Sequence, residues 1–210
     1  MAKPLSGLSY PNKMGRLYLM ALEEVLGKNG INTVLRLADL PQFIDHYPPD
    51  NLDKQFDFVY ISALNDAIET IYGVRGGRGL EQRVGRRLFS EGLRNFGALS
   101  GAGDLAFKVL PLNTKLKIGV PAIARVFNAI TDQISNVYEY EDYFIYTLER
   151  CSMCWERTSD QPCCHTAVGI IHEALRWLSG GLEFKIDILS CMANGGDMGR
   201  LKIYKKPLGE

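Results

Sequence analysis

Cysteine is the residue type in this chain whose spacing best suits chemistry. Four of the five cysteines and one of the three histidines fall within residues 151–165, in a C-x2-C-x8-C-C-H pattern. A C-x2-C pair often supplies two of the four ligands of a tetrahedral zinc ion. Cys151 and Cys154 fit this half-site. The remaining candidate ligands are Cys163, Cys164, His165 and, further along the chain, Cys191.

Three other interpretations of these thiols stay open. Four thiolates can hold an iron–sulfur cluster. A C-x-x-C pair can be a redox motif, but that motif accompanies a βαβ unit, for which the sequence shows no pattern. Reduced cysteines are also among the most buried residue types and often only pack. His46 and His172 are isolated from the cluster in sequence, and His172 borders an apolar helical stripe, which favours a half-buried histidine over a ligand.

The bulk composition limits the class of protein. With 210 residues the chain can form a full core, and it needs neither disulfides nor a metal merely to fold. The formal net charge is zero, which argues against nucleic acid as a partner. No apolar run approaches the roughly 20 residues of a membrane helix, and the N-terminus has no signal-peptide stretch. We therefore expect a cytoplasmic protein with reduced thiols and no membrane span.

Hydrophobic periodicity predicts the elements that must position the cysteines. Apolar residues recur at helical spacing over about 14–26, 31–38, 56–72, 80–96, 113–132 and 167–178. Glycines at 27 and 73–79 are expected to end helices. Alternating, β-branched and aromatic runs predict strands over about 137–141, 143–149, 184–189 and 200–204.

This order of elements predicts an α+β fold. We expect an antiparallel sheet of about four strands with helices packed on one side, preceded by a helical N-terminal region. The predicted organisation is a flexible arm over 1–13 and a single domain over 14–210. That domain has a helical part, 14–133, and a strand-rich part, 134–206.

Two further groups of side chains suggest a bound molecule. Aromatic residues could line an apolar cavity between sheet and helices, or could simply fill the core: Phe127, Tyr138, Tyr140, Phe144, Tyr146, Trp155 and Trp177. Arginines around the glycine-rich stretch could bind an anionic head group, or could be solvated: Arg75, Arg78, Arg83, Arg86 and Arg87. A phosphate loop is disfavoured, because the Lys-Ser/Thr ending is absent.

The C-terminal motifs resemble the 4-vinyl-reductase domain family. The resemblance covers about residues 143–204 and rests on Cys151-x2-Cys154-Trp155-x-Arg157-Thr158-x2-Gln161-Pro162-Cys163-Cys164-His165-x3-Gly169, Gly180-Gly181 and Cys191-Met-Ala193-Asn-Gly195. It implies a fold similar to the TRAPP trafficking subunits, commonly dimerised through helices. The family includes a bacteriochlorophyll-biosynthesis protein and the sensor domains of aromatic-responsive transcription activators.

The resemblance also implies a zinc site. Its ligand pattern places two cysteines on Cys164 and Cys191, but the other two positions hold Ile188 and Gly199, which offer no ligand. The C-x2-C pair can replace these two. The predicted metal ligands are therefore Cys151, Cys154, Cys164 and Cys191, with Cys163 and His165 as substitutes. The predicted cofactor is zinc, and an iron–sulfur cluster is the second choice.

These patterns favour a binding protein over an enzyme. We expect a homodimeric carrier or sensor for a hydrophobic molecule such as a tetrapyrrole, an aromatic compound or an acyl chain, with an optional cysteine-bound metal. The first alternative is a reductase of a vinyl side chain in (bacterio)chlorophyll biosynthesis, although the chain shows neither a dinucleotide fingerprint nor a catalytic dyad. The second alternative is a TRAPP-like dimeric interaction scaffold.

Overall fold

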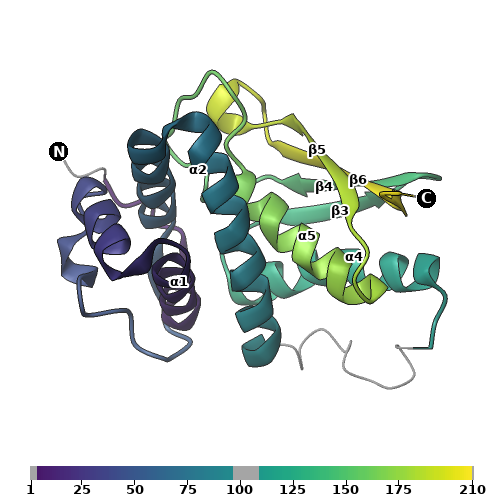
Figure 1. Cartoon of the computed structure of the whole chain (residues 1–210), viewed down its shortest axis with the longest axis horizontal. Helices are drawn as coiled ribbons and strands as arrows, with labels where there is room; N and C mark the ends of the chain where they lie inside the picture. Colours follow the sequence, from purple (N-terminus) through teal and green to yellow (C-terminus); the bar gives the residue numbers. More distant parts are fainter. Residues whose placement is uncertain (1–3, 97–108, 210) are drawn as a thin grey trace.

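The computed structural model describes residues 4–96 and 109–209 and places a four-stranded sheet beside a group of helices (Figure 1). Residues 1–3 of the predicted arm and residue 210 lie outside the described residues. In chain order the elements are β1 (Ser9–Pro11), α1 (Asn12–Leu37), η1 (Pro41–Phe43), β2 (Lys54–Asp57), α2 (Phe58–Phe96), α4 (Leu112–Ile130), β3 (Ser135–Glu139), β4 (Tyr143–Leu148), α5 (His165–Ser179), β5 (Phe184–Ser190), η3 (Met192–Asn194) and β6 (Gly199–Pro207).

The main sheet has the order β3-β4-β6-β5, and each neighbouring pair is antiparallel. Side chains alternate between the two faces of a strand. Phe144 and Tyr146 of β4 are buried and pair with Ile203 and Leu201 of β6, so this face forms the core side of the sheet. The helices lie on one side of it, which confirms the predicted α+β fold class (Figure 1).

Helix α5 is the central helix, because it packs against both α2 and α4. It ends at Gly180, which has a φ of 78°, and the N–H of Gly181 donates to the carbonyl of Arg176 at 2.8 Å, as in a Schellman motif. Helices α2 and α5 cross at Gly85 and Gly169. A Cβ at Gly85 would lie 2.1 Å from the carbonyl oxygen of Thr166, so the two backbones are in direct contact.

Glycines kink the two long helices. Gly27 in α1 and Gly73 in α2 have φ of 72° and 71°, a conformation that glycine adopts without the strain other residues incur. The breaks predicted at these two glycines are therefore present. However, α2 resumes directly after Gly73, so residues 74–79 are helical and not the predicted loop.

A two-stranded antiparallel sheet, β1 with β2, was not predicted from the sequence. Tyr10 pairs with Phe56 in its register. Asp57, directly before α2, accepts hydrogen bonds from the N–H groups of Val59, Ser6 and Gly7. It thereby caps α2 and holds the preceding segment against it. The division of the chain into an arm and one domain stays a prediction.

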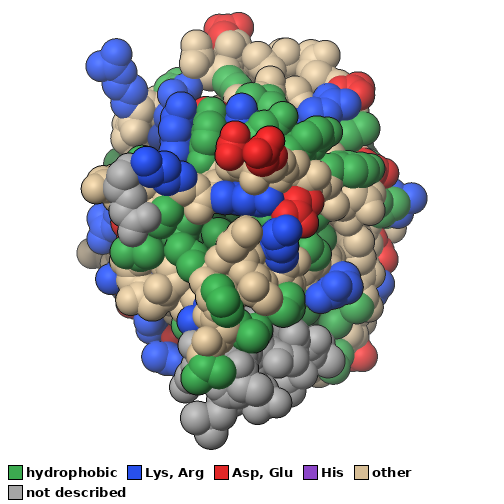
Figure 2. All heavy atoms as spheres, turned by 90° about the vertical axis from the view of Figure 1, so that its right-hand side faces the viewer, with side chains coloured by type: hydrophobic (Ala, Val, Ile, Leu, Met, Phe, Trp, Pro, Cys, Tyr) green, Lys and Arg blue, Asp and Glu red, His purple; other side chains and the backbone are tan. Residues whose placement is uncertain are grey.

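The surface mixes both signs of charge. On the face drawn in Figure 2, Lys and Arg side chains are interspersed with Asp, Glu and apolar ones. One ion pair links Lys205 of β6 to Glu139 of β3 at 2.6 Å. Within the described ranges, the structure has no helix that is long and apolar enough to cross a bilayer.

Candidate functional site

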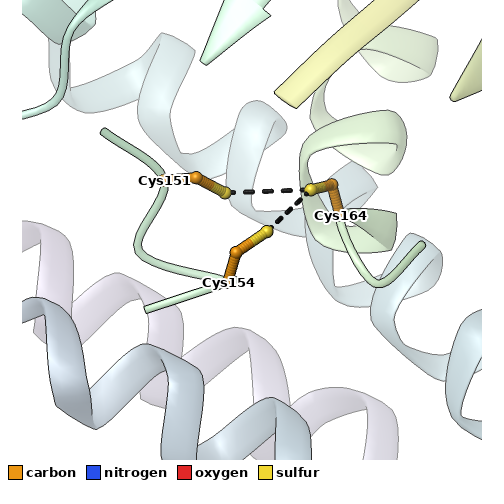
Figure 3. Close-up of side chains that lie close together, drawn as sticks. All are labelled: Cys151, Cys154 and Cys164. Carbon is orange, nitrogen blue, oxygen red and sulfur yellow. Dashed lines mark hydrogen bonds between the residues drawn. The ribbon is translucent and has the colours of Figure 1, made fainter. Parts of the chain in front are cut away.

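The five cysteines lie together in the core, each at most 3% exposed and none in a disulfide. The Sγ of Cys154 lies 3.1 Å from that of Cys164 and 3.3 Å from that of Cys191. The Sγ of Cys151 is 3.8 Å from Cys164, and that of Cys163 is 3.7 Å from Cys191. In Figure 3 the side chains of Cys151, Cys154 and Cys164 point toward one another.

Two groups of three sulfur atoms are compact enough to hold a metal ion. In each group the atoms lie within 4.8 Å of one another: Cys151, Cys154 and Cys164 form the first, and Cys154, Cys163 and Cys191 form the second. The structure thus brings together all four predicted ligands and the substitute Cys163. We refer to these five residues as the thiol cluster.

Three separate segments position the thiol cluster. After β4 the chain turns, and the N–H of Cys154 donates to the carbonyl of Cys151. Cys164 is the N-cap of α5, and Cys191 stands between β5 and η3. The loop after the turn is tied to η3, because the N–H of Ser159 donates to the carbonyl of Ala193 at 2.8 Å.

Hydrogen bonds among the thiols lower the pKa of two of them and raise the pKa of the other three. Donation from Cys154, and then from Cys163 and Cys164, lowers the pKa of Cys191. Donation from Cys154 and Cys164 likewise lowers the pKa of Cys151 to about 5. The thiols that donate must keep their protons, so the pKa values of Cys154, Cys163 and Cys164 are raised. Within the cluster, negative charge on Cys151 and Cys191 is stabilised, and further negative charge is opposed unless a cation binds.

A buried ion pair lies beside the cluster. The Arg157 side chain is 2% exposed, and it donates to Glu69 at 2.8 Å and to the carbonyl of Met153 at 3.1 Å. Glu81 of α2 is fully buried, and its carboxyl oxygens have no hydrogen-bond partner among the described residues. Burial, and then the charge of Glu69, raises the pKa of Glu81 well above its usual range.

The three histidines differ in burial. His165 is 7% exposed, and neither ring nitrogen has a partner within the described residues. Burial, and then the charge of Arg78, lowers its pKa to about 4. His172 is half-buried on α5, as expected from the sequence, and burial followed by the charge of Arg86 lowers its pKa. His46 is exposed, and its Nδ1 lies 3.0 Å from the carbonyl of Ile44.

We expect His172 to make the protein less stable in mild acid. Because its folded-state pKa lies below the unfolded value of about 6.5, its neutral form stabilises the fold fully above that pH. That contribution is lost as the pH falls below about 6.5. Urea unfolding between pH 7.5 and 5 should show a smaller loss of stability in His172→Asn than in the native chain. His46→Asn is the surface control, and an unchanged pH slope in His172→Asn would contradict the expectation.

Two small apolar cavities lie between the helices and the sheet. The first, of about 100 Å³, is lined by residues of α1, α2, α4 and α5, with Leu88, Ile123 and Ala174 among them. The second, of about 40 Å³, adjoins it and reaches Tyr146 and Met153. No cysteine lines either cavity. Drug-sized ligand pockets are roughly 300–1,000 Å³, so these cavities are small.

The predicted aromatic residues divide into three groups. Phe127, Tyr146 and Trp177 line the cavities. Phe144 is core, and Trp155 packs edge-on to Phe58 at 6.2 Å. Tyr138 and Tyr140 are about half exposed, at 52% and 49%. Tyr138 pairs with Ile145, so it lies on the face of the sheet opposite to Phe144 and Tyr146 and does not reach the cavities.

Three of the five predicted head-group arginines are paired with other side chains of the fold. Arg86 binds Glu183 at 2.8 Å and Glu173 at 3.3 Å. Arg87 pairs with Glu24 and Glu91. Arg78 donates to Gln161 at 2.9 Å, while Arg75 and Arg83 are exposed. The five side chains are not gathered around a cavity among those described.

Sequence reasoning missed Glu81 and the Arg157–Glu69 pair. Glu81 had a readable signal, since it falls on the apolar stripe of α2 with Val84 and Leu88 at spacings of three and four. A carboxyl on such a stripe is expected to be buried. No local sequence pattern indicates that Arg157 pairs with Glu69, because 88 residues separate them.

Comparison with known proteins identifies the fold class as that of the H-NOX (heme nitric oxide/oxygen binding) domains. An H-NOX protein from S. oneidensis in the Fe(II)NO ligation state is 13% identical, with a TM-score of 0.56 over 92% of this chain and 99% of that chain. The Fe(II) unliganded H-NOX protein from K. algicida is 12% identical, with a TM-score of 0.57 over 93% and 96%.

A third similar structure comes from work on heme distortion in the H-NOX family. It is 13% identical, with a TM-score of 0.57 over 96% of this chain and 97% of that chain. At such identities the similarity shows the fold alone. No protein-family model matches the chain, and no curated protein matches it.

These findings correct the sequence-based assignment. The resemblance to the 4-vinyl-reductase domain family is wrong, since the similar structures are H-NOX domains. The functions derived from it are wrong as well: the carrier or sensor of a hydrophobic molecule, the vinyl reductase and the TRAPP-like scaffold. Zinc and an iron–sulfur cluster find no support, and neither does the homodimer. The physical reason is that cysteine and glycine motifs record local turns and ligand spacing, which recur on different folds.

Proposed function

We propose that this chain is a binding module for a soft metal ion, held by the thiol cluster on an H-NOX-like fold. The observation that carries the proposal is the convergence of all five cysteines of the chain from three segments. Thiolates are soft ligands, and they select soft ions such as Cu(I). The thiols are free, as expected for a protein of a reducing compartment such as the cytoplasm.

Core packing alone accounts poorly for this arrangement. Buried cysteines that only fill space contact other apolar side chains, whereas these sulfurs contact one another at 3.1–3.9 Å. The guanidinium of Arg157 is also buried beside them, since it donates to the carbonyl of Met153, the residue before Cys154, at 3.1 Å. An apolar cluster does not need a buried cation, but an anionic thiolate cluster is stabilised by one.

The heme named for the similar structures does not fit the residues of this chain. Heme iron takes a histidine, cysteine, methionine or tyrosine as its axial ligand. Across the described ranges, the residues that line the two apolar cavities include no histidine and no cysteine. The sequence of residues 97–108 contains none of these four residue types.

The remaining donors at the cavities are weak. They are the thioethers of Met14 and Met153 and the phenols of Tyr10, Tyr18 and Tyr146. Burial raises the pKa of each of these phenols, so they are neutral. A cavity of about 100 Å³ is also small even against the roughly 300 Å³ of a small ligand pocket. Among the residues that line a third cavity, of about 710 Å³, only Tyr60 is of a type that can ligate heme iron, and burial raises the pKa of its phenol. We therefore assign no heme to this chain.

The test is to load the reduced, full-length protein with Cu(I) without oxygen and to remove unbound ion by gel filtration. Bound Cu(I) should co-elute with the protein and should protect the cysteines from alkylation, as counted by mass spectrometry. The fluorescence of Trp155, which follows Cys154, should change during loading. Hemin added in parallel should give no saturable absorption change.

A matched control is His46→Asn, which removes a potential metal ligand at the surface and should leave Cu(I) loading unchanged. The proposal fails if Cu(I) does not co-elute, or if all five thiols are alkylated equally fast with and without the ion. Saturable hemin binding with a bound iron ligand would instead restore heme as the ligand of the fold.

A further inference from the structure

The Sγ of Cys154 is the central atom of the five sulfurs. Cys154 belongs to both groups of three that could hold a metal ion. It also forms a third triangle with Cys164 and Cys191, whose sulfurs are 3.7 Å apart. Cys151 belongs only to the first group, and Cys163 belongs only to the second. The two three-sulfur sites therefore share a single atom, the Sγ of Cys154.

The number of donors is hard to reconcile with one ion. A single tetrahedral ion takes four ligands, which would leave one of the five buried thiols without a role. Two three-coordinate ions that share one sulfur use all five. A three-coordinate all-thiolate site suits Cu(I), which is soft and has no need of a fourth ligand.

We infer that the thiol cluster holds two Cu(I) ions, one in the group of Cys151, Cys154 and Cys164 and one in the group of Cys154, Cys163 and Cys191, bridged by Cys154. This inference rests on the proposed function and names its ion, its stoichiometry and its bridging residue. Metal binding needs the deprotonated ligands, so loading releases protons. Five thiolates with two Cu(I) ions carry a net charge of minus three.

The surroundings of the cluster accommodate part of this negative charge. The buried guanidinium of Arg157 donates to the carbonyl of Met153, next to Cys154 in the chain, although it also pairs with Glu69. Cys164 caps the N-terminus of the fifteen-residue helix α5, whose peptide dipoles favour negative charge there. Arg78 contributes a positive charge next to His165 on the same side.

The experiment is a Cu(I) titration of the reduced full chain against a chromophoric Cu(I) chelator, followed by X-ray absorption of the loaded protein. We expect two Cu(I) per chain, about three sulfurs around each copper, and a short copper–copper vector. Cys151→Ser leaves one complete group and should bind one Cu(I), and Cys163→Ser should also bind one. Both variants should lose the copper–copper vector.

Cys154→Ser removes the shared sulfur, so this variant should lose both ions to the chelator. Replacing a cysteine that belongs to only one group should release only one ion. Circular dichroism checks that each variant is folded. Where a variant does not fold, the X-ray absorption of the native chain decides the question by itself.

The outcomes separate the inference from the proposed function. One ion surrounded by four sulfurs, with no copper–copper vector, would overturn the bridged pair and leave soft-metal binding in place. Equal stoichiometry in Cys151→Ser and Cys154→Ser would also overturn it. If the native chain takes up no Cu(I), both the inference and the proposed function fail.

Discussion

Replacing Gly85 by alanine should destabilise the protein by about 3 kcal/mol, the upper range for an overpacked core. The added Cβ would lie 2.1 Å from the carbonyl oxygen of Thr166 and 2.9 Å from the backbone nitrogen of Ile170. These are backbone atoms of α5, so no side-chain rotation can relieve the contact. Helices α2 and α5 must separate, which also disturbs the start of α5, where Cys164 is held. Urea or thermal unfolding measures the loss.

Gly79→Ala is the matched control for this prediction. Gly79 lies on the same helix, but a Cβ there would meet nothing within 4 Å. Alanine is favoured over glycine inside a helix by about 1 kcal/mol, so this variant should be at least as stable as the native chain. Gly169→Ala should repeat the effect of Gly85→Ala, because its Cβ would lie 2.2 Å from the carbonyl oxygen of Gln82. Similar stabilities for Gly79→Ala and Gly85→Ala would show that the helices do not touch as described.

Replacing Arg157 by leucine should lower the free energy of unfolding by about 3–5 kcal/mol, because removing one partner of a buried ion pair leaves the other charge buried and unpaired. The Arg157 side chain is 2% exposed and that of Glu69 is 13% exposed, so the carboxylate left behind is poorly solvated. The carbonyl of Met153 loses its donor as well. Chemical denaturation under reducing conditions, with a metal chelator present, measures the effect without any contribution from bound ions.

Two variants test the origin of this loss. Arg94→Leu removes an arginine that is 69% exposed and paired with Glu91, and it should change stability by less than about 0.5 kcal/mol. Adding Glu69→Gln to Arg157→Leu should recover part of the loss, because the stranded charge is then absent. A loss in Arg157→Leu that matches that in Arg94→Leu would mean that the buried pair does not stabilise the fold.

Local patterns determined the elements of this fold. The alternation in β4 and β6 predicted strands, and the apolar stripe of α5 predicted a helix, because both signals come from neighbours a few residues apart. Gly27 and Gly73 were predicted to end helices and instead kink them, since positive φ is tolerated there by glycine. The short strands β1 and β2 were missed, because three or four residues carry too little periodicity to read.

The sequence by itself determined that cysteines from positions 151–164 and 191 would gather, since the turn spacing and the predicted strands bring them near one another. Only the tertiary structure decided that all five sulfurs meet around Cys154, that Tyr138 faces away from Tyr146, and that Gly85 touches α5. The zinc and family assignments were wrong because they too were made from local motifs, without knowledge of the tertiary structure. Strand register and helix crossing depend on contacts between residues far apart in the chain, and local composition does not encode those contacts.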